Sequence, residues 1–385
     1  MIPIKYNVRN LRMRWVGTLM TILGTGLVVW SSCILFGLVQ GLQHSLNVSG
    51  DPLGLIILRK GSTDETNGGF ATSQADDIAT LKGIARDEKG LLVANEMVNI
   101  PIAERIEGTR TNIIMRGVSS GSSRLRPNFQ VLPGGRYFEA GKGECIVSKG
   151  LSKRFKNAAL GNVLKLGEKE TYRVVGIFTA GGSAAESEVW VDLGDLEQNI
   201  NRKGYVSSVR LRAASPNDLD SIKKTIDGST QFKLAAWKET AYYASQADAG
   251  RLLIVGGTLI ALFLTFGAMF AAANTMFSAV KSRTREIGTM RALGFSRLDI
   301  LISFMGESLL LCLLGGALGL LATLPLSALT FSTNLNFTEA AIAFRFGPIV
   351  MGVALAMTLA MGLFGGLFPA VRAVKLDVVR ALREV

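Results

Sequence analysis

The chain has 385 residues, of which 48% are hydrophobic and 19% charged, and its 42 Lys and Arg side chains outnumber 30 Asp and Glu. Soluble domains carry about 25% charged residues. A charge-poor composition with a net charge of +12 therefore excludes a disordered or acidic protein and disfavours a soluble enzyme. Basic chains often bind nucleic acid, and the positions of the charges test that possibility.

Four apolar stretches are long enough to cross the ~30 Å hydrocarbon layer of a membrane, which takes about 20 helical residues. The first follows residues 1–15, and its apolar run is longer than the core of a signal peptide, so we expect an uncleaved anchor. The four transmembrane helices are expected at residues 16–42, 251–280, 298–329 and 347–368.

Nine of the twelve excess positive charges flank these stretches, in residues 1–15, in the loop after the second stretch and in the tail 369–385. Because positive residues mark the cytoplasmic side of a membrane, we expect both termini and the loop to be cytoplasmic. Residues 43–250 and the external loop 330–346 then lie outside the cytoplasm. The charge is a signal of topology, and we expect no nucleic-acid partner.

Residues 43–250 have the composition of a soluble domain, and their pattern mixes strands with helices. Strands are expected at 55–58, 172–178 and 207–212, the last with the alternation of a half-buried strand. Helices are expected from Ser73 to Leu81, with Ser73 as the cap, and at 217–226. The fold class is thus an α-helical membrane protein with four transmembrane helices and one large α+β extracytoplasmic domain inserted between helices 1 and 2.

Two points of organisation in this domain stay open. Gly and Ser clusters at both edges of residues 119–201 indicate an inserted subdomain, and a single continuous domain with long surface loops explains them equally well. Helical periodicity without proline from Leu234 to Val280 predicts that the second span continues outward as a stalk, and the first span is expected to do the same.

Nothing in the domain predicts catalysis. Its acidic residues are scattered, and Glu186-Ser187-Glu188 is interpreted as a solvated turn. The three cysteines, Cys33, Cys145 and Cys312, have no metal-binding spacing, and the chain has no phosphate-binding G-x-x-x-x-G-K-[ST] sequence. We therefore expect a protein that is not an enzyme and holds no metal or cofactor.

The cytoplasmic loop 281–297 contains a short, basic, amphipathic helix. Arg283 and Glu286 are spaced to pair with each other, and the small residues Gly288 and Ala292 would let another surface approach closely. Gly294 is typical of a helix terminator, and Ser296 to Asp299 has the form of a capping box that begins the next helix.

The segment Arg285-Glu286-Ile287-Gly288-Thr289-Met290-Arg291-Ala292-Leu293-Gly294 closely resembles the signature of the FtsX/MacB-like permeases of ABC transporters, the type VII or mechanotransmission class. Near the end of the chain, Phe368-Pro369-Ala370-Val371-Arg372-Ala373 and the following residues Leu376 to Arg383 resemble the C-terminal signature of the same family. Tyr6 to Leu11 resembles its amphipathic N-terminal segment. Together with the expected topology, the resemblance covers essentially the whole chain.

The resemblance implies a permease subunit that couples ATP hydrolysis to movement of its periplasmic domain, driving export or extraction of a periplasmic or outer-leaflet substrate. The alternative is an FtsX-like signalling scaffold that activates a cell-wall hydrolase without transport. Since no phosphate-binding loop is found, ATP and Mg are expected in a separate cytoplasmic ABC ATPase. The family's coupling helix, which docks on that ATPase, corresponds to Arg285, Glu286, Ile287, Gly288, Arg291, Ala292, Leu293 and Gly294.

The family further implies a second permease copy, as a homodimer or a paralogous heterodimer, a periplasmic adaptor (membrane fusion) protein, and membrane lipids as partners. The location implied is the bacterial cytoplasmic (inner) membrane, crossed several times.

Within the spans, two kinds of residue are candidates for structural roles. Small residues four apart allow close helix packing, within the chain or in a dimer. Glu307 is an acid well inside a span, where an isolated charge costs about 2.5–3.5 kcal/mol, so it needs a partner or water. The candidate packing pairs are Gly37 with Gly41, Gly315 with Gly319, and Gly362 with Gly366.

Overall fold

The computed structural model describes residues 15–126, 128–167, 170–229, 232–249, 251–328, 330–335, 338–376 and 378. The chain divides into two compact units, described separately below. The helical unit takes Met1–Gln40, Arg251–Leu329 and Phe344–Val385, and the sheet unit takes Gly41–Gly250 and Thr330–Ala343. The amphipathic segment expected before the first span lies outside the described residues except for Trp15, as does nearly all of the tail after Leu376.

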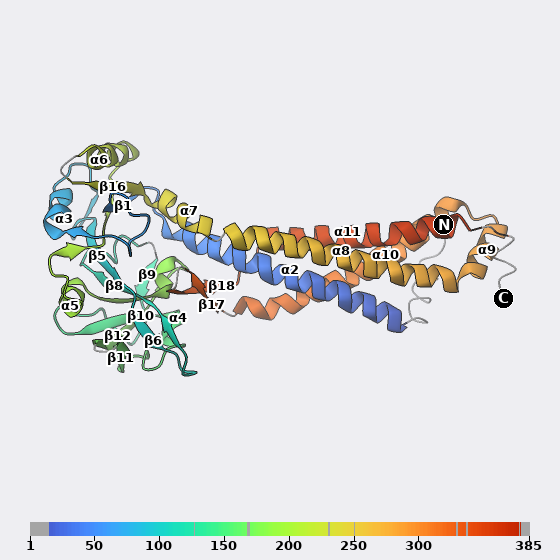
Figure 1. Ribbon diagram of the computed structural model, residues 1–385, viewed down its shortest axis with the longest axis horizontal. Helices are drawn as coiled ribbons and strands as arrows, with labels where there is room; N and C mark the ends of the chain where they lie inside the picture. The colour runs from blue at the N-terminus through green and yellow to red at the C-terminus, as the bar shows by residue number, and fades with distance from the viewer. Residues whose placement is uncertain are drawn as a thin grey trace. The chain divides into compact units, whose positions relative to one another are not determined.

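Four long apolar helices form the helical unit and run alongside one another (Figure 1). Each is long and apolar enough to cross a membrane. The expected fold class, with four such helices and a large α/β domain between the first and the second, is confirmed. The helices are α2 (Trp15–Ser49), α8 (Arg251–Ser282), α10 (Arg297–Thr323) and α11 (Pro348–Val374), with the short α9 (Thr284–Ala292) before α10 and the 3-10 turn η2 (Leu324–Ala328) after it.

Glycines on α10 and α11 bring the helices into close contact. A Cβ on Gly319 would lie 2.5 Å from the carbonyl oxygen of Gly26, and one on Gly315 would collide with Thr25, so this pair packs against α2. The same construction on Gly362 reaches the Cα of Leu309 at 2.9 Å.

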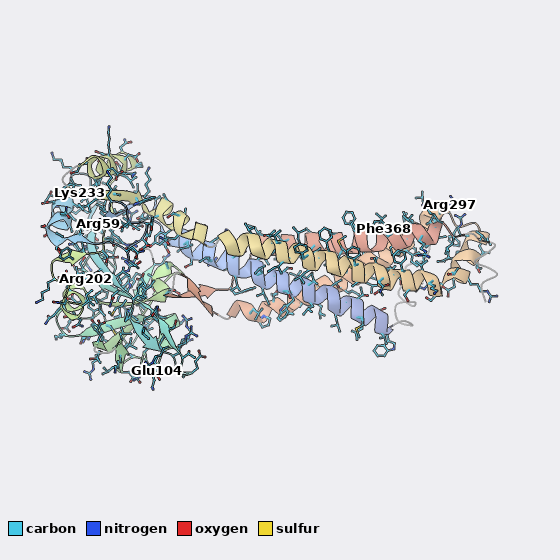
Figure 2. The ribbon with its side chains drawn as sticks, in the orientation of Figure 1. Arg59, Glu104, Arg202, Lys233, Arg297 and Phe368 are labelled. Carbon is cyan, nitrogen blue, oxygen red and sulfur yellow. The ribbon has the colours of Figure 1, made fainter. Side chains whose placement is uncertain are left out.

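Gly366 likewise meets the Cβ of Ser308 at 2.6 Å, so the Gly362 and Gly366 pair packs against α10. On α2, Gly37 lies against the Phe344 ring and Gly41 is buried. All of these contacts lie within one chain. The glycine pairs therefore allow the long helices of a single chain to pack closely. Exposed side chains such as Phe368 lie on the outside of the helices (Figure 2).

A ten-stranded mixed sheet organises the sheet unit. β10 pairs in parallel with β12, and β13 with β8, whereas the remaining pairs are antiparallel. In pairing order the strands are β11 (Val163–Leu166), β12 (Glu170–Ala180), β10 (Glu144–Ser148), β13 (Glu188–Asp192), β8 (Ile114–Val118), β5 (Val93–Asn99), β15 (Ser208–Arg212), β1 (Gly54–Arg59) and β16 (Leu234–Lys238), and β9 (Phe129–Val131) pairs with β12.

Helices and short hairpins complete this unit. The helices are α3 (Thr72–Ala79), α4 (Lys149–Ser152), the 3-10 turn η1 (Ala184–Ser187), α5 (Leu193–Asn199), α6 (Pro216–Gly228) and α7 (Glu239–Ala249). Two-stranded pairs are β2 (Phe70–Ala71) with β14 (Tyr205–Val206), β3 (Arg86–Asp87) with β4 (Gly90–Leu91), and β6 (Ile102–Glu104) with β7 (Arg110–Asn112). The expected external loop contains a further hairpin of β17 (Thr330–Leu335) and β18 (Thr338–Ala343).

Both faces of the sheet are buried in strands β10, β13, β8, β15 and β1. In β1, Leu55 and Ile57 pack on α3 and α6, whereas Ile56 and Leu58 pack on Tyr242 of α7. Segment 119–201 supplies five strands at one end of the sheet, joined to the rest where β13 pairs with β8. An apolar cluster of the segment includes Met97 and Met115 from outside it. The segment therefore shares one continuous sheet with the rest of the unit, and its main apolar cluster differs from the one around β1.

Two local predictions were wrong. Residues 234–238 form the edge strand β16 instead of the start of a long helix, because pairing with β1 outweighs helical periodicity. The α3 helix begins at Thr72 after Ala71, without a side-chain cap, so Ser73 lies inside the helix. By contrast, α6 has Ser215 as its cap, and its Oγ accepts the Asp218 N–H.

Candidate functional site

Two local signals separate α9 from α10 in the loop that follows α9. The N–H of Gly294 bonds to the carbonyl of Arg291, and that of Phe295 to Met290, a Schellman motif in which Gly294 has φ +94°. Ser296 and Asp299 then form the complete capping box that starts α10. The predicted terminator and capping box are both confirmed, and together they fix the turn from α9 into α10.

One side of α9 packs on the chain's own helices. Ile287 is buried in a cluster with residues of α8, α10 and α11, and Gly288 beside it is also buried. The cluster comprises Met276, Val280, Ile287, Ile300, Phe304, Leu311, Ala370 and Ala373. This side attaches α9 to three of the long helices.

The other side of α9 is exposed. Leu293, in the turn after the helix, is 74% exposed. Arg291 is half-buried, while Arg285, Glu286, Ala292 and Gly294 are exposed. Gly288 is buried against the long helices, whereas Ala292, four residues later, is exposed, so the two small residues do not share one exposed surface.

Glu307 of α10 has the partner that its position requires. Arg283 Nη1 donates to its Oε2 at 3.0 Å, and both side chains are less than one-tenth exposed. The sequence spacing had paired Arg283 with Glu286. In the structure Arg283 lies at the junction of α8 and α9 and turns toward the helices, where it neutralises the acid in α10.

A second charge cluster, in the sheet unit, was missed by sequence reasoning. Its centre is Arg116 of β8, which forms two hydrogen bonds to Glu188 at 2.7 and 2.9 Å and two to Glu65 at 2.9 and 3.1 Å. Arg116 and Arg126 also bond to Glu96. We call Glu65, Glu96, Arg116, Arg126, Glu188, Arg210 and Glu239 the buried ion network, because all seven are less than one-tenth exposed.

The buried ion network reaches the first residue of α7. Glu239 accepts a bond from Arg210 at 3.2 Å and from the backbone N–H of Asp51, directly after α2, at 2.9 Å. A Cβ on Gly54 would lie 2.6 Å from this carboxylate, so any larger residue there would displace the Glu239 side chain. Glu239 thus connects the segment after α2, the start of α7 and strand β15.

Three acids of the buried ion network have shifted pKa values, and the shifts differ in direction. Burial alone would raise the pKa of Glu96, but Arg126 and Arg116 outweigh it and lower the value to about 2. The pKa of Glu65 also lies well below its usual range, because Arg116 and Arg210 overcome the effect of burial. For Glu239 burial dominates over Arg210 and raises the pKa.

The alternation of residues along strands β5, β8 and β15 already placed three members of this network on one face of the sheet. Arg116, Glu96 and Arg210 alternate with apolar residues that face the other side, which usually indicates a solvent face. Here α7 and the loops cover that face, so the expected half-buried strand at 207–212 is buried on both sides. The predicted solvated turn is also wrong, since Glu188 is buried and Glu186 accepts the N–H groups of Ala180 and Gly182.

Among the described residues, no group of three or more His, Cys, Asp or Glu side chains is placed to hold a metal ion. The three cysteines are free and buried. The arrangement is one of helices packed by glycines, two buried charge clusters and one exposed helix face.

The fold and these sites define a membrane protein with four spanning helices and a large domain inserted after the first. Two family models match the chain: MacB-like periplasmic core domain over residues 18–228, and FtsX-like permease C-terminal over residues 258–378. The first alone covers more than half of the chain. The chain therefore belongs to the MacB-like and FtsX-like family of ABC transporter permeases.

Curated relatives agree with this assignment. The macrolide export ATP-binding/permease protein MacB of Shewanella sp. (strain ANA-3) is 27% identical over 239 residues, covering 59% of this chain and 35% of that protein. MacB of Shigella boydii serotype 4 (strain Sb227) is 28% identical over 59% of this chain and 36% of its own length. This chain thus spans about a third of the curated relatives it matches.

Solved structures give weaker likenesses. The periplasmic region of MacB from Actinobacillus actinomycetemcomitans aligns with 53% of this chain and 96% of its own, at 10% identity and a TM-score of 0.38. The extracellular domain of the ABC-type transporter YknZ from Gram-positive bacteria aligns with 48% of this chain and 99% of its own, at 19% identity and a TM-score of 0.37.

Proposed function

We propose that this chain is the permease of an ABC transporter that converts ATP hydrolysis by a cytoplasmic ATPase into movement of its inserted domain. The movement drives export or extraction of a substrate from the periplasm or the outer leaflet of the inner membrane. ATP and Mg bind to the ATPase, and two permease copies form the working assembly. Membership of the permease family supports this proposal, since relatives of this chain are named ATP-binding/permease proteins.

The observation that carries the proposal is the two-sided character of α9. Its inner side is fixed to α8, α10 and α11 through Ile287 and Arg283. Its outer side offers Arg285, Glu286 and the exposed Leu293. A force applied to the outer side would reach the long helices directly, as a docking site for an ATPase requires.

The test is purification of the tagged full chain from its native membranes and identification of co-purifying ATPase subunits. Leu293→Asp places a charge in the exposed apolar contact of α9, and we expect it to abolish co-purification. Leu298→Asp is the matched control, because Leu298 is 66% exposed and follows α9 by a few residues. If wild type retains no ATPase, or if both variants bind it as wild type does, docking through α9 is wrong.

A further inference from the structure

The buried Arg283 and Glu307 pair joins α9 to the interior of α10. Arg283 is the residue between α8 and α9, and its carbonyl accepts the N–H of Ile287 at 2.9 Å, the first helical bond of α9. Its guanidinium bonds to Glu307, well inside α10, at 3.0 Å. Any displacement of the first turn of α9 therefore pulls directly on α10.

The contact continues from α10 to α11. Ser308, next to Glu307, donates its hydroxyl to the carbonyl of Gly362 on α11 at 2.9 Å. On the same level, Gly362 and Gly366 leave no room for even a Cβ between the helices. Close-packed interiors transmit displacement because they do not deform continuously. A shift of Glu307 consequently moves α11 as well.

The contact between the start of α9 and the interior of α10 is a buried ion pair, where apolar side chains would be the more common contact. Buried ion pairs give little net stability compared with apolar side chains, although loss of one partner is costly because it strands a charge. Within the described part of the chain, Arg283 Nη2 is buried without a hydrogen-bond partner. The pair is thus not optimised for stability, and its directional bond instead specifies one position of α9 against α10.

We propose that Arg283 and Glu307 are positioning residues that make α9, α10 and α11 move as one body when the ATPase displaces α9. The proposal rests on the proposed function for the source of the force, but the rigid link itself is a property of this chain. Without the pair, α9 tilts about the junction at Arg283, and ATP is hydrolysed without moving the spans.

The first test uses the full chain alone in lipid nanodiscs, with nitroxide labels at Ala292→Cys and Leu321→Cys, both exposed sites on α9 and α10. The double variant Arg283→Gln/Glu307→Gln removes the ion pair without stranding a charge, and Glu307→Gln strands Arg283. We expect a narrow distance distribution in wild type, a broader one in both variants, and a narrow one again in the reversed pair Arg283→Glu/Glu307→Arg. Unchanged burial of Cys33 and Cys312 shows that the variants remain folded. A double Gln variant as narrow as wild type would overturn the proposal.

The second test uses the chain with its co-purified ATPase and one label at Leu321→Cys. We expect incubation with ATP and vanadate, which traps the nucleotide in the ATPase after hydrolysis, to change the mobility of this label in wild type. The double Gln variant should lose that change while it retains the bound ATPase and its hydrolysis, and Arg283→Lys, which retains the charge, should keep it. A full nucleotide response in the double Gln variant would refute the positioning role. If wild type binds no ATPase, the proposed function fails, and the nanodisc measurement still decides whether the link exists.

Discussion

The seven side chains of the buried ion network do not balance: they are four glutamates and three arginines. Glu96 contacts all three arginines, and this surplus of positive charge keeps its pKa low in spite of burial. Glu239 pairs with Arg210 and accepts one backbone N–H, with Arg126 acting from farther away, and burial outweighs these and raises its pKa. Of these two acids, Glu239, the residue that begins α7, therefore takes up a proton more readily.

Neutralising these two acids should have different effects. Glu96→Gln leaves three arginines without their shared carboxylate, and we expect a loss of about 3–5 kcal/mol in the free energy of unfolding. Glu239→Gln keeps an oxygen for the Asp51 N–H and removes the excess charge, so its effect should stay within about 1 kcal/mol. Unfolding is measured by the reaction of the Cys145 thiol with a dye, in a chain that carries Cys33→Ala and Cys312→Ala. This thiol is buried in the folded protein, and burial raises its pKa to about 12, so it reacts only after unfolding.

The same two variants should separate the contributions of Glu96 and Glu239 to the pH dependence of the free energy of unfolding. A Glu with a folded pKa of about 2 and an unfolded one of about 4.3 stabilises above pH 4.3, and this stability is lost as the pH falls toward 2. Glu239 has a raised pKa, so stability rises as the pH falls through it. Glu239→Gln should abolish the gain in stability at falling pH that Glu239 causes, and it should retain the loss of stability toward pH 2 that Glu96 causes. Equal unfolding curves for the two variants at neutral pH would contradict this account of the network.

The glycine contacts of α10 differ along one helix and offer a matched comparison. Gly319 faces the carbonyl of Gly26 on α2, whereas a Cβ on Gly306 meets open space. Gly319→Ala should cost about 1–3 kcal/mol, because the two helices must separate. Gly306→Ala should be neutral or stabilise by up to about 1 kcal/mol, since Ala is the better helix former.

Exposure of Cys33 and Cys312 to a thiol-reactive dye during heating measures both effects, because the two cysteines are buried in the cluster formed by α2, α8, α10 and α11. Equal melting temperatures for the two variants would show that α2 does not depend on this close approach.

The elements that the sequence predicts well depend on neighbours a few residues away. The stop at Gly294, the capping box at Ser296 and the strands at 55–58 and 172–178 are of this kind. The pairing of Arg283 with Glu307 joins residues 24 apart, and burial of Arg210 requires α7 and the Glu65 loop to cover its strand. Periodicity in the sequence does not show which elements cover a strand from outside, and for this reason the alternation indicated a solvent face where the structure has a buried one.

For the whole chain, the sequence predicted four spans and one inserted domain because apolar length and composition act over entire segments. It could not decide between an inserted subdomain and a continuous domain. That choice depends on strand order, and β13 pairs with β8 across a long stretch of sequence. The contacts of the paired glycines likewise needed coordinates, since small residues four apart fit a neighbouring helix of the same chain as well as a second copy.

The remaining expectation concerns the side of the membrane on which each segment lies. Positive residues near span ends favour a cytoplasmic position for α9 and an external one for the sheet unit. We expect a membrane-impermeant maleimide to label Lys82→Cys, an exposed site in the sheet unit, in intact spheroplasts. Ala292→Cys on α9 should react only after permeabilisation. The native cysteines are buried and give a low background. Labelling of Ala292→Cys in sealed cells would reverse the topology and place α9 out of reach of any cytoplasmic ATPase.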